Sequence, residues 1–150
     1  PLIFKILEQR FKKGVLIFQK RLAGRICAGV GEKGYCRLSV ALGRRANIEI
    51  LEALGGDVFH PRPDVDSSIV KIERSKPRFD IPSEEFFKLV LEELFNHREL
   101  SVEQALQKSR QHLLSARSLQ GLSGKLRGKV VYRVTPREFG EIACTCWLAK

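Results

Sequence analysis

The sequence predicts an α/β part followed by an all-α part, and three observations lead to this fold class. Before about residue 74, short stretches of strand length alternate with stretches of helical spacing. Residues 75–82 contain two prolines in a polar setting and form the best candidate for a domain boundary. Beyond them, the segments have helical spacing and helix caps. We therefore expect two domains, residues 1–76 and residues 77–150.

The first domain begins with a predicted helix over residues 1–12, which has one apolar face and a stop signal at Gly14. Residues 15–18 are a continuous apolar run, which is typical of a strand buried on both faces. The remaining elements predicted here are helices over residues 20–28 and 37–45 and strands over residues 47–54 and 68–73.

Three helices of the second domain are predicted from their N-terminal caps. Ser83 precedes two acidic residues, which favour the first turn of a helix. Ser101 begins a second helix, predicted to end near residue 114. Thr135 and Glu138 form a capping box around Pro136, so the last helix runs from there towards Lys150. The predicted buried stripe of the first helix is Phe86, Phe87, Val90, Leu91, Leu94 and Phe95.

Composition narrows the class of function. The 150 residues are 43% hydrophobic and 29% charged, which excludes disorder throughout. No apolar run approaches the ~20 residues that cross a bilayer, and the start lacks a secretory signal, so we expect a cytoplasmic protein with no membrane partner. The net charge of +10 favours a polyanionic partner. Because the sequence contains no Met, we expect a processed chain or a piece of a longer one.

The basic residues cluster in the second domain. Between Gln104 and Arg137 there are eight bases and no acid. This block is either a solvated face or a surface that contacts phosphates, and the overall charge favours the second interpretation. Tyr132 is the only aromatic residue in it, so base stacking along the block is not expected. The candidate residues for phosphate contacts are Lys108, Arg110, Lys125, Arg127, Lys129 and Arg133.

Two other patterns do not predict sites. Residues 29–34 match G-x-G-x-x-G, but a dinucleotide-binding loop must leave a strand directly, and here a predicted helix intervenes. We therefore expect a surface loop and no cofactor site in this chain. The four cysteines and three histidines lack the paired spacing of metal ligands, so we expect incidental or structural thiols and no metal.

The most specific motif lies between the last two predicted strands. It reads Phe-His-Pro-Arg-Pro-Asp-Val-Asp-Ser over residues 59–67. The prolines exclude both helix and ladder pairing, so they form a stiff extended loop that holds an aromatic ring in place. In an arbitrary protein such a Phe is a buried residue beside a turn. A base taken out of a nucleic-acid stack also needs a platform of this kind.

This motif resembles the F-x-P-x-P-x-V-D-S signature of the ribosomal RNA adenine N6,N6-dimethyltransferases, the kasugamycin-resistance type and its archaeal and eukaryotic relatives. Further stretches resemble the same family in the same order, with the last similar to archaeal-type enzymes. These stretches are residues 1–7, 15–20, 34–40, 46–51 and 131–139. After Arg98 the sequence departs from the several basic residues usual in the family.

The resemblance implies the C-terminal portion of a Rossmann-like methyltransferase sheet followed by a small helical RNA-binding domain. It also implies dimethylation of N6 of adenines in small-subunit ribosomal RNA with S-adenosyl-L-methionine, whose site lies upstream of this chain. Phe59 would stack on the target adenine, and Pro61 and Pro63 would position the loop. The 150 residues alone are then incomplete and inactive without the N-terminal remainder of the enzyme. The alternatives are a non-catalytic RNA-binding module and an erythromycin-resistance-type methyltransferase acting on large-subunit RNA.

Overall fold

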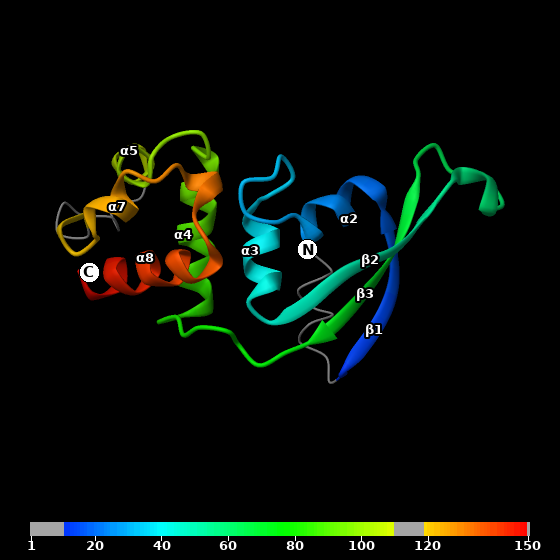
Figure 1. Ribbon diagram of the computed structural model, residues 1–150, viewed down its shortest axis with the longest axis horizontal. Helices are drawn as coiled ribbons and strands as arrows, with labels where there is room; N and C mark the ends of the chain where they lie inside the picture. Colours follow the sequence, from blue (N-terminus) through cyan, green and yellow to red (C-terminus); the bar gives the residue numbers. More distant parts are fainter. Residues whose placement is uncertain (1–10, 110–118, 150) are drawn as a thin grey trace. The chain divides into compact units, whose positions relative to one another are not determined.

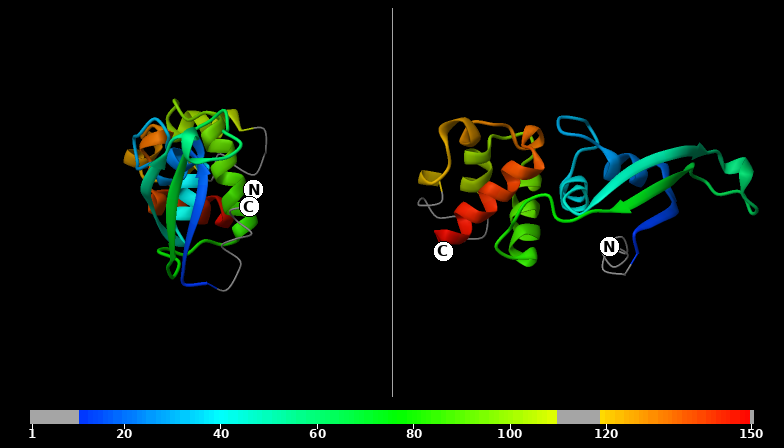
Figure 2. Two further views of the ribbon diagram at one scale, coloured as in Figure 1. Left: turned by 90° about the vertical axis from the view of Figure 1, so that its right-hand side faces the viewer. Right: turned by 60° about the horizontal axis from the view of Figure 1, so that its bottom comes forward.

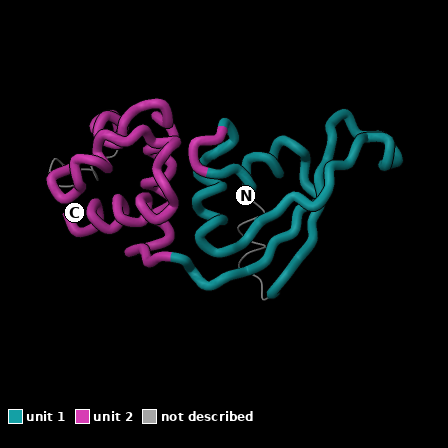
Figure 3. The backbone as a smooth tube through the Cα atoms, in the orientation of Figure 1, with its two compact units in different colours: residues 1–29, 33–78 teal, residues 30–32, 79–150 magenta. Residues whose placement is uncertain are grey.

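A computed structural model describes residues 11–109 and 119–149. The chain divides into two compact units, shown in different colours in Figure 3. Unit 1 comprises residues 1–29 and 33–78, and unit 2 comprises residues 30–32 and 79–150. A short piece of the glycine-rich loop therefore belongs to the helical unit.

Unit 1 contains a three-stranded antiparallel sheet (Figure 1). Its strands are β1 (Lys13–Gln19), β2 (Ala46–Leu54) and β3 (Ser67–Arg74), in the order β1-β3-β2. A bulge between Ile50 and Glu52 shifts the register of β2 against β3. The two later strands agree with the sequence prediction to within one residue at each end.

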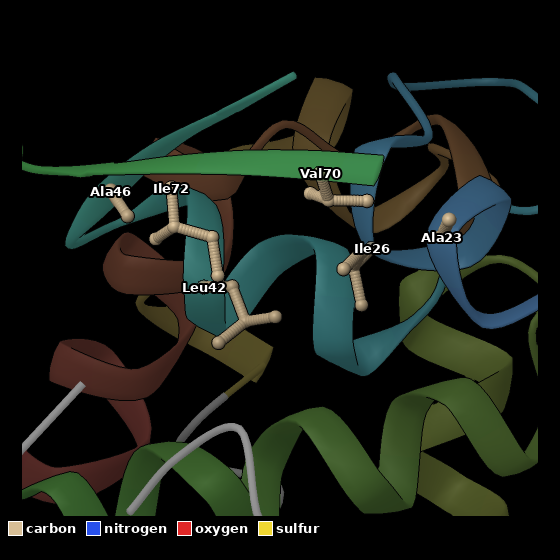
Figure 4. Close-up of a cluster of buried hydrophobic side chains, with 6 residues drawn as sticks. All are labelled: Ala23, Ile26, Leu42, Ala46, Val70 and Ile72. Carbon is tan, nitrogen blue, oxygen red and sulfur yellow. The ribbon is translucent and has the colours of Figure 1, made fainter. Parts of the chain in front are cut away.

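Helices α2 (Lys20–Cys27) and α3 (Arg37–Gly43) cover one face of this sheet. Apolar side chains from both helices meet those of the strands in a continuous core, shown in Figure 4. The fully or almost fully buried members of this core are Ala23, Ile26, Leu42, Ala46, Val70 and Ile72.

The prediction that residues 15–18 are buried on both faces is wrong. Leu16 and Phe18 pack against the core, whereas Val15 and Ile17 are 57% and 54% exposed. Successive side chains of a strand point to opposite faces, and the described helices of unit 1 cover only one of them. An exposed apolar stripe therefore lies on the outer face of β1.

Two predicted helix ends also differ from the structure. Residues 1–10 of the first predicted helix lie outside the described residues, and Phe11 and Lys12 are not helical. Lys12 is instead paired with the last strand, because its carbonyl accepts a hydrogen bond from the Arg74 N–H at 2.9 Å. Helix α3 ends at Gly43, two residues earlier than predicted.

Unit 2 consists of helices and short turns, seen from two further directions in Figure 2. Its elements within the described residues are α4 (Glu84–Asn96), α5 (Val102–Lys108), α7 (Gly124–Arg127), η2 (Val131–Arg133) and α8 (Pro136–Leu148). The three predicted caps are confirmed, since the hydroxyls of Ser83, Ser101 and Thr135 accept hydrogen bonds from backbone N–H groups in the first turns.

Aromatic pairs hold α4 and α8 together. Phe86 meets Trp147 edge to face at 5.1 Å between ring centroids, and Phe95 stacks on Phe139 at 5.3 Å. All six residues of the predicted stripe on α4 contribute to the packing, although Phe95 is only half-buried. Contacts of this kind contribute about 0.5–1.5 kcal/mol beyond area burial.

Helix α5 is shorter than predicted. It ends at Lys108, because Ser109 adopts an extended conformation with φ −59° and ψ 131°. The Ser109 hydroxyl donates to the carboxylate of Glu93 on α4 at 2.7 Å. A serine side chain thus finds a partner outside the helix and ends it.

Candidate nucleic-acid interface

The loop that carries the proline motif connects β2 to β3. The short helix η1 (Gly56–Val58) follows β2, and Phe59 then adopts an extended conformation with φ −116° and ψ 147°. The peptide bond between His60 and Pro61 is cis. Because Ser67 opens β3, the whole motif lies at the end of the sheet where Gln19 also ends β1.

Gly56 brings the two arms of this loop into close contact. It is buried, and a Cβ added there would lie 3.1 Å from the Pro63 carbonyl oxygen. An open pocket of about 310 Å³ lies beside this contact, lined by residue 56 and residues 62–66. Phe59 itself is half-buried and does not belong to the buried core. The predicted platform is therefore partly open, unlike a Phe fully buried beside a turn.

Lys20 anchors the far end of the loop. Its backbone N–H donates to the Asp66 carbonyl at 2.9 Å, and its ammonium lies 3.2 Å from the Asp66 carboxylate. Because Lys20 is the first residue of α2, the loop is attached to the start of that helix as well as to the strands. Sequence reasoning did not find this anchor, since the two residues are 46 positions apart and both belong to common residue types.

The candidate RNA-binding residues of unit 2 do not all have the same environment. Lys108 is exposed at the end of α5, and Lys125 and Arg127 lie on the single turn of α7. Arg133 is exposed at the end of η2. Arg110 lies outside the described residues.

Lys129 differs from the others because it has a structural partner. Its ammonium donates to both carboxylate oxygens of Glu138, at 2.8 and 2.7 Å. Burial raises the pKa of Glu138, but the hydrogen bonds from Lys129 and Thr135 outweigh it, so the pKa lies below its usual value. Any contact of Lys129 with RNA would have to compete with this ion pair.

The ring of Tyr132 is within cation–π distance of two arginines of the same unit. The guanidinium carbons of Arg98 and Arg133 are 5.6 and 5.7 Å from its ring centroid, within the range of cation–π contacts. The Tyr132 N–H also donates to the Arg98 carbonyl at 3.2 Å. Both guanidinium groups therefore contact the same ring, although Arg98 and Arg133 are 35 positions apart in the sequence.

The glycine-rich loop does not fit S-adenosyl-L-methionine or a dinucleotide. It follows helix α2 and not a strand, so it does not join a strand to a helix N-terminus as a phosphate-binding loop does. Gly31, with φ +84°, donates its N–H to the Tyr132 carbonyl at 3.0 Å. This amide is therefore used for packing within unit 2.

No group of three or more metal-ligating side chains occurs in residues 11–109 and 119–149. All four cysteines are free thiols. Burial raises the pKa of Cys27; it also acts to raise that of Cys36, where hydrogen bonds with Ser39 outweigh it and lower the pKa. Among the described helices, none is long and apolar enough to cross a membrane.

Comparison with known proteins places this arrangement in context. A family described as "Ribosomal RNA adenine dimethylase" matches residues 1–131. The chain is 34% identical over 149 residues to a probable ribosomal RNA small subunit methyltransferase A of Methanococcus maripaludis strain S2, covering 95% of this chain and 56% of that protein. It is 36% identical to the protein of the same description from Thermococcus kodakarensis, covering 95% and 52%. The chain thus spans about half the length of these curated relatives.

Two solved structures share the fold. A dimethyladenosine transferase from Plasmodium falciparum superposes with a TM-score of 0.80 at 22% identity, covering 95% of this chain and 60% of that one. The 23S rRNA methyltransferase ErmE superposes with a TM-score of 0.60 at 20% identity, covering 97% and 59%. Both are methyltransferases, so the two units together have part of a methyltransferase fold.

Proposed function

Because the chain belongs to the ribosomal RNA adenine dimethylase family, we propose that it is the C-terminal part of an enzyme that dimethylates N6 of adenines in small-subunit ribosomal RNA. The match to this family over residues 1–131 is the observation that carries the proposal. The methyl donor is S-adenosyl-L-methionine, and its site lies in the N-terminal remainder of the enzyme. We place the enzyme in the cytoplasm.

Phe59 is the residue of this chain that we assign to the target base. An adenine whose N6 is to be methylated has to leave its stack, and an aromatic face can replace the lost stacking. The half-buried ring lies on a loop fixed by prolines at positions 61 and 63 and tied to α2 through Asp66 and Lys20. A ring held in this way loses little entropy when a base stacks on it. Pro61 and Pro63 are therefore positioning residues.

The outer face of β1 is the surface that we assign to the N-terminal remainder. Val15 and Ile17 are both more than half exposed there, and Ile69 of β3 lies directly opposite Ile17. Sheets of doubly wound enzymes are covered by helices on both faces, but the described helices of unit 1 cover only one. The missing part would bury this apolar stripe.

The basic side chains of unit 2 supply the contacts to the RNA backbone. Lys108, Lys125, Arg127 and Arg133 carry charges that no carboxylate within residues 104–137 offsets. Contacts to phosphates position an RNA without reading its sequence. Arg110 completes the set, whereas Lys129 is held by Glu138, so RNA would have to compete with that pair for its charge.

The test is a methylation assay of the full-length protein with S-adenosyl-L-methionine and RNA of the small or the large ribosomal subunit. Mass spectrometry of the digested RNA should find dimethyladenosine only in the small-subunit RNA. Modified large-subunit RNA alone would indicate an erythromycin-resistance type of activity, and RNA binding without methylation would indicate a binding module. In parallel, calorimetry should detect no binding of S-adenosyl-L-methionine to the isolated 150 residues.

A further inference from the structure

Besides the basic block of unit 2, the protein has a basic region in unit 1. It lies at the end of the sheet away from the Phe59 loop. The strand register places Lys13 opposite Glu73 and Ala46 opposite Arg74, whereas Ser67 and its partners lie at the loop end. Figure 1 shows the tip of β3 beside the start of β1. At about 3.3 Å per residue, the eight residues of β3 separate the two ends by roughly 23 Å.

A pocket of about 370 Å³ opens at this end. It is lined by Phe11, Lys12, Arg74, Ser75, Lys76 and Pro77, so three of the six lining side chains are cations and none is an acid. Lys12, Arg74 and Lys76 are exposed. The neighbouring carboxylate, Glu73, alternates to the other face of β3 and lies 3.7 Å from the Lys13 ammonium.

The backbone around this pocket is fixed. The Arg74 N–H donates to the Lys12 carbonyl at 2.9 Å, and the Ser75 N–H donates to the Arg45 carbonyl at 2.8 Å. The Arg78 N–H likewise donates to the Arg44 carbonyl at 3.1 Å. The predicted domain boundary therefore begins as a segment whose backbone is hydrogen-bonded to the rest of unit 1.

The Ser75 hydroxyl is the second observation that points to a ligand. Its oxygen is buried and has no hydrogen-bond partner among the residues that the structure describes. A buried hydroxyl without a partner is costly, and most such groups in folded proteins are satisfied. A hydroxyl beside two lysines and an arginine is a donor set typical of phosphate contacts.

We propose that the pocket formed by Lys12, Arg74, Ser75 and Lys76 binds a backbone phosphate of the RNA substrate, as a second contact remote from the Phe59 loop. This inference rests on the proposed function, because it takes the polyanion to be the methylated RNA. We assign the site to the phosphodiester because three cations around one hydroxyl match the negative charge that every nucleotide of the backbone carries. It would therefore increase affinity for long RNA without changing the chemistry at N6.

The test compares Ser75→Ala and Lys76→Gln with the matched control Lys88→Gln in the full-length enzyme. Lys88 is exposed on α4 and carries the same charge as Lys76, so both lysine variants change the net charge equally. Affinity for small-subunit RNA and its dependence on salt are measured by fluorescence anisotropy, with Tm recorded for each variant. Single-turnover methylation is measured at saturating RNA.

We expect Ser75→Ala to weaken RNA binding about five- to tenfold, the effect of one lost hydrogen bond. Its Tm should be unchanged or higher, because the substitution removes an unsatisfied buried hydroxyl. Lys76→Gln should lower the slope of log K against log[salt] by up to about one, with Lys88→Gln having little effect. The methylation rate at saturating RNA should stay within about twofold of wild type in all three variants.

Three outcomes would overturn the proposal. If Ser75→Ala and Lys76→Gln bind RNA with the affinity and the salt dependence of wild type, the pocket does not contact RNA. Normal methylation by the same variants would leave the proposed function standing. An equal loss in Lys88→Gln would assign the effect to net charge. Binding of inorganic phosphate that Ser75→Ala abolishes, with unchanged RNA affinity, would assign the pocket to a small anion. An enzyme that fails to methylate RNA contradicts the proposed function itself.

Discussion

The ammonium of Lys129 donates to both carboxylate oxygens of Glu138, and the same carboxylate accepts hydrogen bonds from the backbone and side chain of Thr135. Lys129 therefore extends the capping box of α8. A basic residue that the sequence groups with RNA ligands thus has a structural partner of its own.

The pair of Lys129 with Glu138 implies that basic residues of the block have two different roles, phosphate contact and structural support. Replacing Lys125, Arg127 and Arg133 together by Ala should weaken RNA binding for all sequences alike. It should also lower the slope of log K against log[salt] by about 0.7–0.9 for each phosphate contact that is lost. Lys129→Ala should change this slope little and should lower the Tm instead. Anisotropy titrations at several salt concentrations check both variants, and an unchanged slope in the triple variant would leave the block a solvated face.

The stability of the protein should depend on the charge of Glu138. Its folded pKa is depressed, so the charged carboxylate stabilises the fold above its unfolded pKa of about 4.3, and this contribution is lost as the pH falls through the folded pKa. At pH 7, Glu138→Gln should lower the free energy of unfolding by about 1 kcal/mol. The difference from wild type should shrink towards pH 3. Urea unfolding at both pH values measures it, and a difference independent of pH would contradict the assignment.

Phe59→Ala in the full-length enzyme should lower kcat/KM on ribosomal RNA roughly 5- to 150-fold, because a base–aromatic stack contributes about 1–3 kcal/mol. Phe59→Tyr and Phe59→Trp keep an aromatic face and should lose much less. The affinity for S-adenosyl-L-methionine should hardly change.

Melting temperature and single-turnover methylation of the same Phe59 variant distinguish stacking from packing. Truncating a fully buried Phe costs about 3–5 kcal/mol, and Phe59 is only half-buried, so its stability cost should be smaller. Normal turnover per folded molecule, combined with a large drop in Tm, would exclude the stacking role.

Gly140→Ala should destabilise unit 2. A Cβ at this position in α8 would lie 2.6 Å from Cδ2 of Phe79, whose ring also packs edge to face on Phe87. Overpacking costs about 1–3 kcal/mol, which exceeds the helix propensity gained from Ala.

Gly24→Ala is the matched control for Gly140→Ala, because Gly24 also lies within a helix and its Cβ would contact nothing within 4 Å. This control should raise stability by about 0.5–1 kcal/mol. Equal effects of the two substitutions in urea unfolding would show that Phe79 moves aside without cost.

Local signals in the sequence predicted much of this fold. Ser83, Ser101 and Thr135 mark helix starts because their hydroxyls satisfy N–H groups only a few residues away. The ends of elements depend on distant partners, as Ser109 and Glu93 show for α5. The exposure of Val15 could not be predicted either, since it depends on what covers the second face of the sheet.

In the candidate site too, features encoded by neighbouring residues could be predicted, and features that depend on tertiary contacts could not. The proline loop was found because its chemistry is contained in nine consecutive residues. The pairing of Lys129 with Glu138 and the unpartnered hydroxyl of Ser75 depend on how separate turns meet, and neither residue type is unusual in its position. Tertiary contacts therefore decide which basic residues are available for RNA.

The strand order β1-β3-β2 also has a consequence for synthesis on the ribosome. Lys13 of β1 pairs with Glu73, 60 residues later, while β2 and β3 are joined by a single loop. The ribosome adds about 5–20 residues per second, so roughly 3–12 s pass between the synthesis of Lys13 and that of its partner Glu73. The local hairpin of β2 and β3 can form as soon as both strands have emerged, whereas closing a loop of this length slows the addition of β1. Nascent chains should therefore acquire β1 last, and Leu16 and Phe18, which pack against the core in the folded chain, stay open to chaperones until then.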